Sequence, residues 1–146
     1  MVGLIVTGHG TLATGLLDSL SMVVGEQPCV QAVPFIESRA GTYAADLRDA
    51  IRTMHRVAEG VIVLADFVGG TPFTQAMLAA HELDAVEVVA GVNAPMLLKL
   101  VSERTDCADL SQLVECIVEA GKAGVVHTSL KDIMGSTDSS LNKDAC

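Results

Sequence analysis

His9 lies between two glycines at the end of a short apolar run, in the sequence GLIVTGHG of residues 3–10. Glycines allow a tight turn and leave space around the imidazole, so we expect the ring to be accessible. Asp66 directly follows a second apolar run, VIVLA at 61–65. A carboxylate that accepts one ring N–H fixes the tautomer and leaves the lone pair of the other nitrogen free. Because a neutral imidazole held in this way is a good nucleophile, His9 and Asp66 are the candidate catalytic pair.

Three glycine-containing loops would bring backbone N–H groups to this pair. They are GHGT at 8–11, DFVGGT at 66–71 and GVN at 91–93, and each leads into an expected helix. The first N–H groups of a helix have no acceptor within the helix and bind anions. Such donors would balance the charge on the equatorial oxygens of a phosphoryl group during in-line transfer. The residues expected to support the phosphoryl group are Gly10, Thr11, Gly69, Gly70 and Thr71.

The same loops do not match the common nucleotide-binding motifs. Residues 10–15 have the glycine spacing of a P-loop, but Leu16-Leu17 replaces the lysine and hydroxyl that bind phosphate and Mg²⁺. GHG at 8–10 opens like a dinucleotide fingerprint, but its third glycine comes too late, at Gly15. A single histidine after a strand is more often a structural residue with satisfied hydrogen bonds. The catalytic interpretation therefore depends on the histidine and the aspartate occurring together.

Strand and helix patterns alternate along the chain. Continuous apolar runs at 3–7 and 61–65 are typical of strands covered on both faces, and 29–35 and 86–90 are two further strand candidates. Apolar residues at helical spacing predict helices between and after these strands, at 12–24, 43–54, 72–80, 94–100 and 110–118. This alternation predicts an α/β fold with an open, mainly parallel sheet and helices on both faces. The first and third strands are neighbours in the usual order, so the candidate pair would meet at the carboxyl edge, where ligands bind.

The third of these helices has a recognisable start. Pro72 suits a first helical position, with Thr71 as the capping residue before it. Its apolar stripe is expected at Phe73, Met77 and Ala80. The sequence therefore predicts which side of this helix faces the sheet.

The end of the chain has a different composition. Residues 125–130, VVHTSL, predict one more strand after the last helix. From Gly135 onward the sequence is mostly Ser, Asp, Lys and Gly, with little to bury. We expect one domain over residues 1–132 and a flexible tail over 133–146.

Length, composition and charge limit the class of protein. The chain has 146 residues, half of them apolar, which suits a single domain. No apolar run approaches the ~20 residues of a membrane span, and no signal peptide is recognisable, so we expect a cytoplasmic protein. The formal net charge is −9 and the basic residues do not cluster, which disfavours nucleic acid as a partner. The acidic surface suits a basic protein partner, or serves only to keep the protein soluble.

Cysteine and histidine spacing gives no sign of a metal or a disulfide framework. Cys29, Cys107, Cys116 and Cys146 form no C-x-x-C pair, and without a secretory signal we expect them to be reduced. No histidine has a second histidine or a cysteine at ligand spacing. We therefore expect no metal and no cofactor.

Three segments in this order, GLIVTGHGTLATGL, VLADFVGGTPF and VVAGVNAPML, closely resemble a known family. It comprises the mannose-type (mannose, fructose and N-acetylgalactosamine) enzyme IIA domains of the bacterial phosphoenolpyruvate-dependent sugar phosphotransferase system. The likeness runs from about Met1 to Asp132. It implies a phosphotransferase that accepts a phosphoryl group from phospho-HPr on Nε2 of His9 and passes it to an enzyme IIB component. The family's supporting aspartate falls on Asp66, and its Ser or Thr after the paired glycines falls on Thr71.

The resemblance also implies a homodimer in which residues 125–130 add a strand to the sheet of the partner copy. Contact with the membrane would be indirect, through the transporter components. Phe67-Val68 departs from the family pattern, which has a Trp before the paired glycines, so the resemblance leaves the partner surface open. Two alternatives remain at this point. One is a phosphoryl donor subunit for dihydroxyacetone kinase, whose motif is usually His-Ser rather than His-Gly. The other is a non-catalytic regulator that senses an anion or small metabolite.

Overall fold

The computed structural model describes residues 1–107 and 109–135. They form an α/β fold around a four-stranded parallel sheet with the strand order β2-β1-β3-β4. The strands are β1 (Gly3–His9), β2 (Val30–Phe35), β3 (Val61–Ala65) and β4 (Val86–Ala90). The predicted sheet is confirmed, including the adjacency of the first and third strands.

Burial of the strands follows their place in the sheet. The central strands β1 and β3 are buried throughout except at His9, whereas the edge strands β2 and β4 each have one buried residue and are otherwise half-buried or exposed. A central strand has helices on both faces and neighbours on both sides, so every side chain needs to be apolar or paired. This explains why the two central strands are the continuous apolar runs of the sequence.

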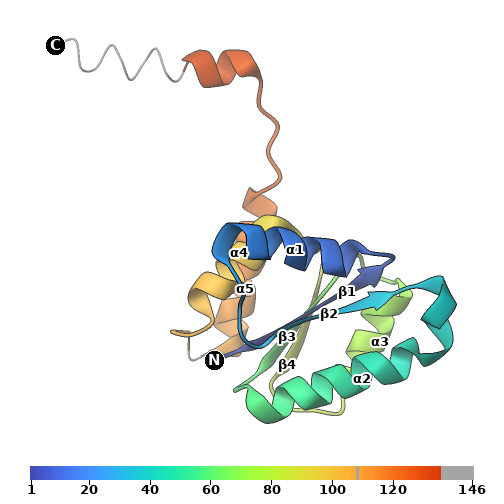
Figure 1. Ribbon diagram of the computed structural model, residues 1–146. Helices are drawn as coiled ribbons and strands as arrows, with labels where there is room; N and C mark the ends of the chain where they lie inside the picture. The colour runs from blue at the N-terminus through green and yellow to red at the C-terminus, as the bar shows by residue number, and fades with distance from the viewer. Residues whose placement is uncertain (108, 136–146) are drawn as a thin grey trace.

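Helices cover both faces of the sheet (Figure 1). One apolar core joins the sheet to α1 (Leu12–Val24), α4 (Ala94–Glu103) and α5 (Leu110–Ala123). A second core on the opposite face joins it to α2 (Ala40–Val57) and α3 (Thr71–Ala80), with the short 3-10 helix η1 (Glu37–Arg39) before α2. Across the described ranges 1–107 and 109–135, the helices are too short or too polar to span a membrane.

The third helix differs in detail from the prediction. α3 begins at Thr71 itself, and Gly70 rather than Thr71 is the N-cap residue. Its buried residues are Pro72, Ala76 and Ala79, while Met77 is 48% exposed. Small side chains allow the helix to lie close against the second core, so the larger residues of the predicted stripe are rotated away from it.

Arg104 lies at the edge of the sheet where β1 and β2 begin, opposite the candidate site, and it is only 2% exposed. Its Nη1 donates to the carbonyl oxygens of Val2 and Cys29, and its Nη2 donates to Oε1 of Gln27, each at 3.4 Å. Burial lowers the pKa of the Arg104 guanidinium. No carboxylate lies within ion-pair distance of it among the described residues.

The predicted strand at 125–130 is not formed in the single chain. Residues 125–129 have no regular secondary structure, residues 130–135 are helical, and both segments lead away from the sheet (Figure 1). A strand is defined by ladder hydrogen bonds to a neighbouring strand, and among residues 1–107 and 109–135 this segment pairs with none. Val125 and Leu130 are 81% and 75% exposed. Pairing with a second copy stays a prediction, and residues 136–146 of the predicted tail lie outside the described part of the chain.

Candidate active site

The structure brings the predicted pair together at the carboxyl edge of the sheet. His9 is the last residue of β1, and Asp66 directly follows β3, the neighbouring strand. Nδ1 of His9 lies 2.6 Å from Oδ2 of Asp66. The His9 side chain is 45% exposed, whereas that of Asp66 is only 7% exposed. The site therefore presents an accessible imidazole on a buried carboxylate.

Hydrogen bonds keep the Asp66 carboxyl ionised. Burial alone would raise its pKa, but the backbone N–H and ring of His9 and the backbone N–H of Phe67 all donate to it and lower the pKa below the ordinary value. An ionised carboxylate has no proton to donate, so Nδ1 of His9 carries the hydrogen of the 2.6 Å contact. The lone pair of the neutral ring is then on Nε2, for which no hydrogen-bond partner exists among residues 1–107 and 109–135.

Two phenylalanine rings support the imidazole. Phe67 stacks on it, with ring centroids 5.0 Å apart and an interplanar angle of 4°. Phe35 meets it edge-on, at 5.4 Å and 74°. The sequence analysis did not predict either contact. The contact with Phe35 could have been predicted from the strand ends. Phe35 ends β2 in register with His9 at the end of β1, so the two side chains lie next to each other.

Glycines at positions 8 and 70 make this close packing possible. A Cβ atom on Gly8 would lie 3.2 Å from Cβ of Asp66. A Cβ atom on Gly70 would lie 3.0 Å from both Cε1 of His9 and Cε2 of Phe67. Such distances are tighter than ordinary van der Waals contact, so larger residues would push the rings and the carboxylate apart.

The residues predicted to support a phosphoryl group lie around the pair in different ways. Thr11 is the N-cap residue of α1, and Gly70 is that of α3, so both helices begin beside the imidazole. Neither helix has a side-chain cap, which leaves first-turn N–H groups without an intrahelical acceptor. Thr71 is exposed and begins α3, close to the same point. The N–H of Gly10 already donates to the carbonyl of Phe35. The role of Gly10 is to let the backbone turn after His9, since its φ is +60°.

The third predicted loop, residues 91–93, binds the backbone that carries Asp66. The N–H of Gly91 donates to the carbonyl oxygen of Asp66 at 3.0 Å, and the N–H of Val92 donates to that of Ala65 at 3.1 Å. Asn93 caps α4, the helix expected after this loop, by accepting from the N–H of Met96. This loop fixes the backbone at the end of β3, and the amides of Gly91 and Val92 are already paired.

A buried polar pair lies behind the rings. The hydroxyl of Thr7 donates to the carbonyl of Val33 at 2.7 Å, and the hydroxyl of Tyr43 donates to Thr7 at 2.5 Å. Burial raises the pKa of Tyr43 to about 12, and the negative charge of Asp66 adds to the rise. Tyr43 therefore stays neutral, and it packs against Phe35 with ring centroids 4.7 Å apart.

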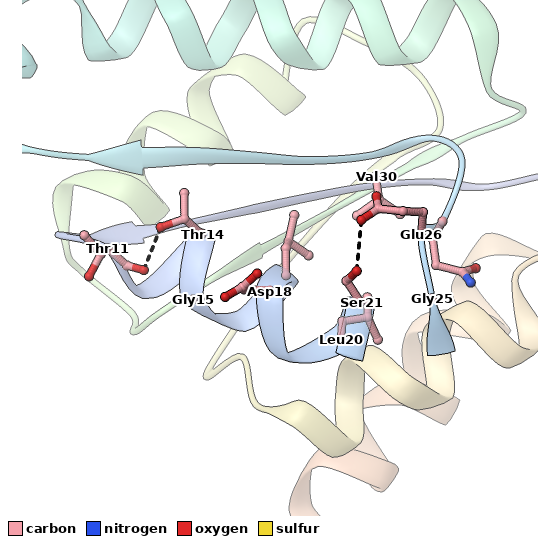
Figure 2. Close-up of a pocket in the computed structure, with 11 residues that line it drawn as sticks. Thr11, Thr14, Gly15, Asp18, Leu20, Ser21, Gly25, Glu26 and Val30 are labelled. Carbon is pink, nitrogen blue, oxygen red and sulfur yellow. Dashed lines mark hydrogen bonds between the residues drawn. The ribbon is translucent and has the colours of Figure 1, made fainter. Parts of the chain in front are cut away.

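A cavity of about 470 Å³ runs along α1, next to this site (Figure 2). Thr11, Thr14, Asp18 and Ser21 of α1 line one side, and Glu26 lies opposite, accepting a hydrogen bond from Ser21. Neither His9 nor Asp66 belongs to its lining. The imidazole of His9 is instead reached from solvent directly, since its side chain is 45% exposed, and this suits a reaction with another macromolecule.

The described residues offer no built site for a metal. Within 1–107 and 109–135, no three side chains of His, Cys, Asp or Glu are grouped so that they could hold an ion. Cys29, Cys107 and Cys116 are free thiols. The fourth cysteine, Cys146, lies outside the described residues.

Comparison with protein families finds a match over residues 3–118 to the family described as PTS system fructose IIA component. The chain belongs to this family. Enzyme IIA components of the phosphotransferase system are phosphotransferases of the sugar-transport machinery. The resemblance stated from the three sequence motifs is thereby confirmed.

Relatives of the IIA family differ in length and in the sugar named. The chain is 33% identical over 109 residues to the fructose-specific EIIA component of Bacillus subtilis, covering 74% of each chain. It is 30% identical over 132 residues to the mannose-specific EIIAB component of Escherichia coli, covering 90% of this chain but only 41% of that relative. The chain thus spans less than half the length of the EIIAB relative.

Solved structures of IIA components have the same fold. An EIIA component from Streptococcus agalactiae superposes with a TM-score of 0.77 at 30% identity, covering 87% of this chain and 97% of that one. A mannose/sorbose-specific IIA subunit from Enterococcus faecalis gives a TM-score of 0.74 at 26% identity, covering 88% and 95%. The IIA fold therefore extends over most of this chain.

Proposed function

We propose that this protein carries a phosphoryl group on Nε2 of His9, accepting it from phospho-HPr and passing it to an enzyme IIB component. The observation that carries the proposal is the 2.6 Å contact between Nδ1 of a half-exposed His9 and the buried carboxylate of Asp66. This contact holds the ring in the tautomer whose lone pair is on Nε2. Membership of the IIA family supports the proposal, since phosphoryl transfer is general to it.

The transfer is a displacement at phosphorus. The lone pair of Nε2 forms the new N–P bond while the bond to the donor histidine breaks, and the donor nitrogen keeps that electron pair. His9 retains the proton on Nδ1, so its ring becomes positively charged. The Asp66 carboxylate balances that charge at 2.6 Å. The reverse displacement by the acceptor restores the neutral ring.

The starts of two helices would bind the transferred oxygens. α1 follows Thr11 and α3 follows Gly70, so both present first-turn N–H groups and the positive end of a helix dipole to the imidazole. The exposed hydroxyl of Thr71 adds a further donor. Backbone donors fixed in this way stabilise the charge of the transferring group without having to reorganise.

The proposed partners fit the surface of the molecule. The formal net charge of −9 favours encounter with a basic donor surface, and the imidazole is open to a protein of that size. We place the protein in the cytoplasm as a homodimer that reaches the membrane only through its transporter components. The kinase-subunit and regulator alternatives are not favoured by the comparisons, whose relatives are sugar IIA components.

Phosphorylation with purified enzyme I, HPr and phosphoenolpyruvate tests the proposal. Intact-mass spectrometry should show one added phosphoryl group that acid removes, and His9→Ala should abolish it. His81→Gln is the matched control, because His81 is exposed at the end of α3 and should leave labelling unchanged. Label that survives in His9→Ala would place the phosphorylated residue elsewhere, and no label on the wild type would contradict the function.

A further inference from the structure

Phe67 is an unusual residue to find beside a reactive histidine. Its side chain is 53% exposed, so burial in a core does not account for its position. It is nevertheless held in place, because its N–H donates to Oδ1 of Asp66 at 3.0 Å and the absence of a side chain at Gly70 leaves room for its ring. The ring lies parallel to the imidazole of His9, within 4°.

The stack restricts a motion that the hydrogen bond to Asp66 leaves open. That bond holds one atom of the imidazole, and the ring plane can still turn about the axis through Nδ1. Phe67 against one face and Phe35 at 74° limit this rotation from two directions. The lone pair of Nε2 lies in the ring plane, so the plane sets the direction of attack on phosphorus. Small errors in such alignment slow a reaction strongly.

The same contact favours the charge that the reaction creates. When Nε2 bonds to phosphorus, the imidazole of His9 becomes a cation. The face of a phenyl ring carries partial negative charge and attracts a cation within about 6 Å of its centroid. Phe67 lies at 5.0 Å and presents its face. Its attraction is therefore greater for the phosphorylated ring than for the neutral one, which is the difference that lowers a barrier.

We propose that Phe67 is a positioning residue for phosphoryl transfer, which aligns the His9 imidazole by stacking and stabilises the positive charge that develops on it. This inference rests on the proposed function of His9. It assigns to Phe67 a role inside the site, distinct from contact with a partner protein. A contact role is the competing explanation, since an exposed phenyl ring also suits a protein interface.

Phosphoramidate separates these two roles, because this small phosphoryl donor makes no protein–protein contact. Phe67→Leu keeps an apolar side chain but removes the planar ring, and it should slow phosphorylation of His9 by phosphoramidate about three- to tenfold. Phe67→Tyr restores the ring and should return the rate to within about twofold of the wild type. The control is Val68→Ala, which should leave the phosphoramidate rate unchanged. Val68 is 73% exposed, and the rings packed on His9 are those of Phe35 and Phe67. His9→Ala gives the background from other histidines.

Proton NMR of the unphosphorylated protein tests the stack independently. The ring current of Phe67 should shift the Hε1 and Hδ2 resonances of His9 upfield in the wild type and in Phe67→Tyr, but not in Phe67→Leu. An unchanged phosphoramidate rate in Phe67→Leu would overturn the inference, and so would a defect limited to the KM for phospho-HPr. If neither donor labels the wild type at His9, the proposed function itself fails. Labelling of the wild type with an unaffected Phe67→Leu variant contradicts only the role of Phe67.

Discussion

His9 and Arg104 lie at opposite edges of the sheet, and the environments of these two nitrogen-bearing side chains are opposite in character. At the carboxyl edge, His9 is 45% exposed and rests on a carboxylate. At the opposite edge, Arg104 is 2% exposed, and its partners in the described part of the chain are carbonyl and amide oxygens. One side chain is left open to solvent with a charged partner, and the other is enclosed with neutral partners.

This difference in exposure indicates that His9 serves the proposed reaction, whereas Arg104 serves the stability of the fold. The guanidinium of Arg104 joins the residue before β1 to the chain before β2, so its loss removes packing and several hydrogen bonds at once. The imidazole of His9 is 45% exposed and makes one side-chain hydrogen bond within the described residues, so we expect its loss to cost the fold less than the loss of Arg104. We therefore expect substitutions at the carboxyl edge to change the rate of phosphoryl transfer, and substitutions at the Arg104 edge to change the free energy of unfolding.

The largest effect is expected for Asp66→Asn. An amide can donate to Nδ1 of His9, which favours the tautomer with hydrogen on Nε2 and removes the attacking lone pair. Phosphorylation by phospho-HPr should fall at least about 100-fold, with the folded structure retained in circular dichroism. Asp18→Asn removes the same charge from the exposed face of α1, where the carboxylate has no partner among the described residues, and should leave the rate unchanged. Equal rates in the two variants would contradict the role of Asp66.

Arg104→Ala should have the reverse profile. Loss of a buried side chain and its three hydrogen bonds should lower the free energy of unfolding by about 2–4 kcal/mol, measured by urea denaturation. The rate of His9 phosphorylation should stay within about threefold under conditions where the variant is folded. Arg39→Ala is the control, since this exposed arginine pairs with Asp46 at 3.3 Å and should contribute less than about 1 kcal/mol. Arg104→Ala would contradict the comparison if it abolished phosphorylation while leaving stability unchanged.

Acid should remove a smaller, specific part of the stability at the carboxyl edge. The pKa of Asp66 is lowered from 3.8 on folding, so its contribution is present above that value and is lost as the pH falls through the folded pKa. The difference in unfolding free energy between wild type and Asp66→Asn should therefore be largest near pH 6 and shrink below about pH 4. Urea denaturation across this range measures it. A difference that grows toward acid pH would show that the carboxylate is destabilised in the folded protein.

The smallest effect is expected at the buried Thr7–Tyr43 pair, which lies behind the site without touching the reacting atoms. Tyr43 is the only tyrosine and the chain has no tryptophan, so tyrosinate absorbance reports this residue alone. Its pKa is raised to about 12, so the neutral phenol stabilises the fold below pH 10, and this contribution is lost between pH 10 and 12.

Tyr43→Phe should cost about 1 kcal/mol of unfolding free energy and leave phosphorylation unchanged. Titration of the phenol near 10 in the folded protein, confirmed by circular dichroism, would contradict its burial. A large loss of phosphorylation in Tyr43→Phe would show that the polar pair belongs to the reaction rather than to the scaffold.

The sequence predicted that His9 and Asp66 lie side by side, because the signals for the two strand ends are local. His9 and Asp66 each follow a continuous apolar run, and adjacent parallel strands bring the two ends together. The helix expected at 94–100 was predicted for the same reason, since the Asn93 side chain and the N–H of Met96 that donates to it are only three residues apart. Where residues close in sequence determine a strand end or a helix start, the sequence pattern was sufficient to predict it.

Features that depend on distant partners were missed. The stack of Phe67 on His9 requires the exact path of the 66–71 loop, and the pairing of Arg104 joins residues 75 or more positions apart. The face of α3 was misassigned because close packing selects Ala76 and Ala79 over larger residues. The strand expected at 125–130 is not formed in the single chain, and its pairing with a second copy stays a prediction.

The isomer of the phosphohistidine tests the central claim most directly. Correlated proton, nitrogen and phosphorus NMR on the protein labelled with nitrogen-15 and phosphorylated through HPr identifies which ring nitrogen of His9 bears phosphorus. Since Asp66 holds Nδ1, the phosphorus should couple to Nε2, and Nδ1 should keep its hydrogen. Phosphorus on Nδ1 would contradict the account, because that nitrogen would first have to leave the carboxylate.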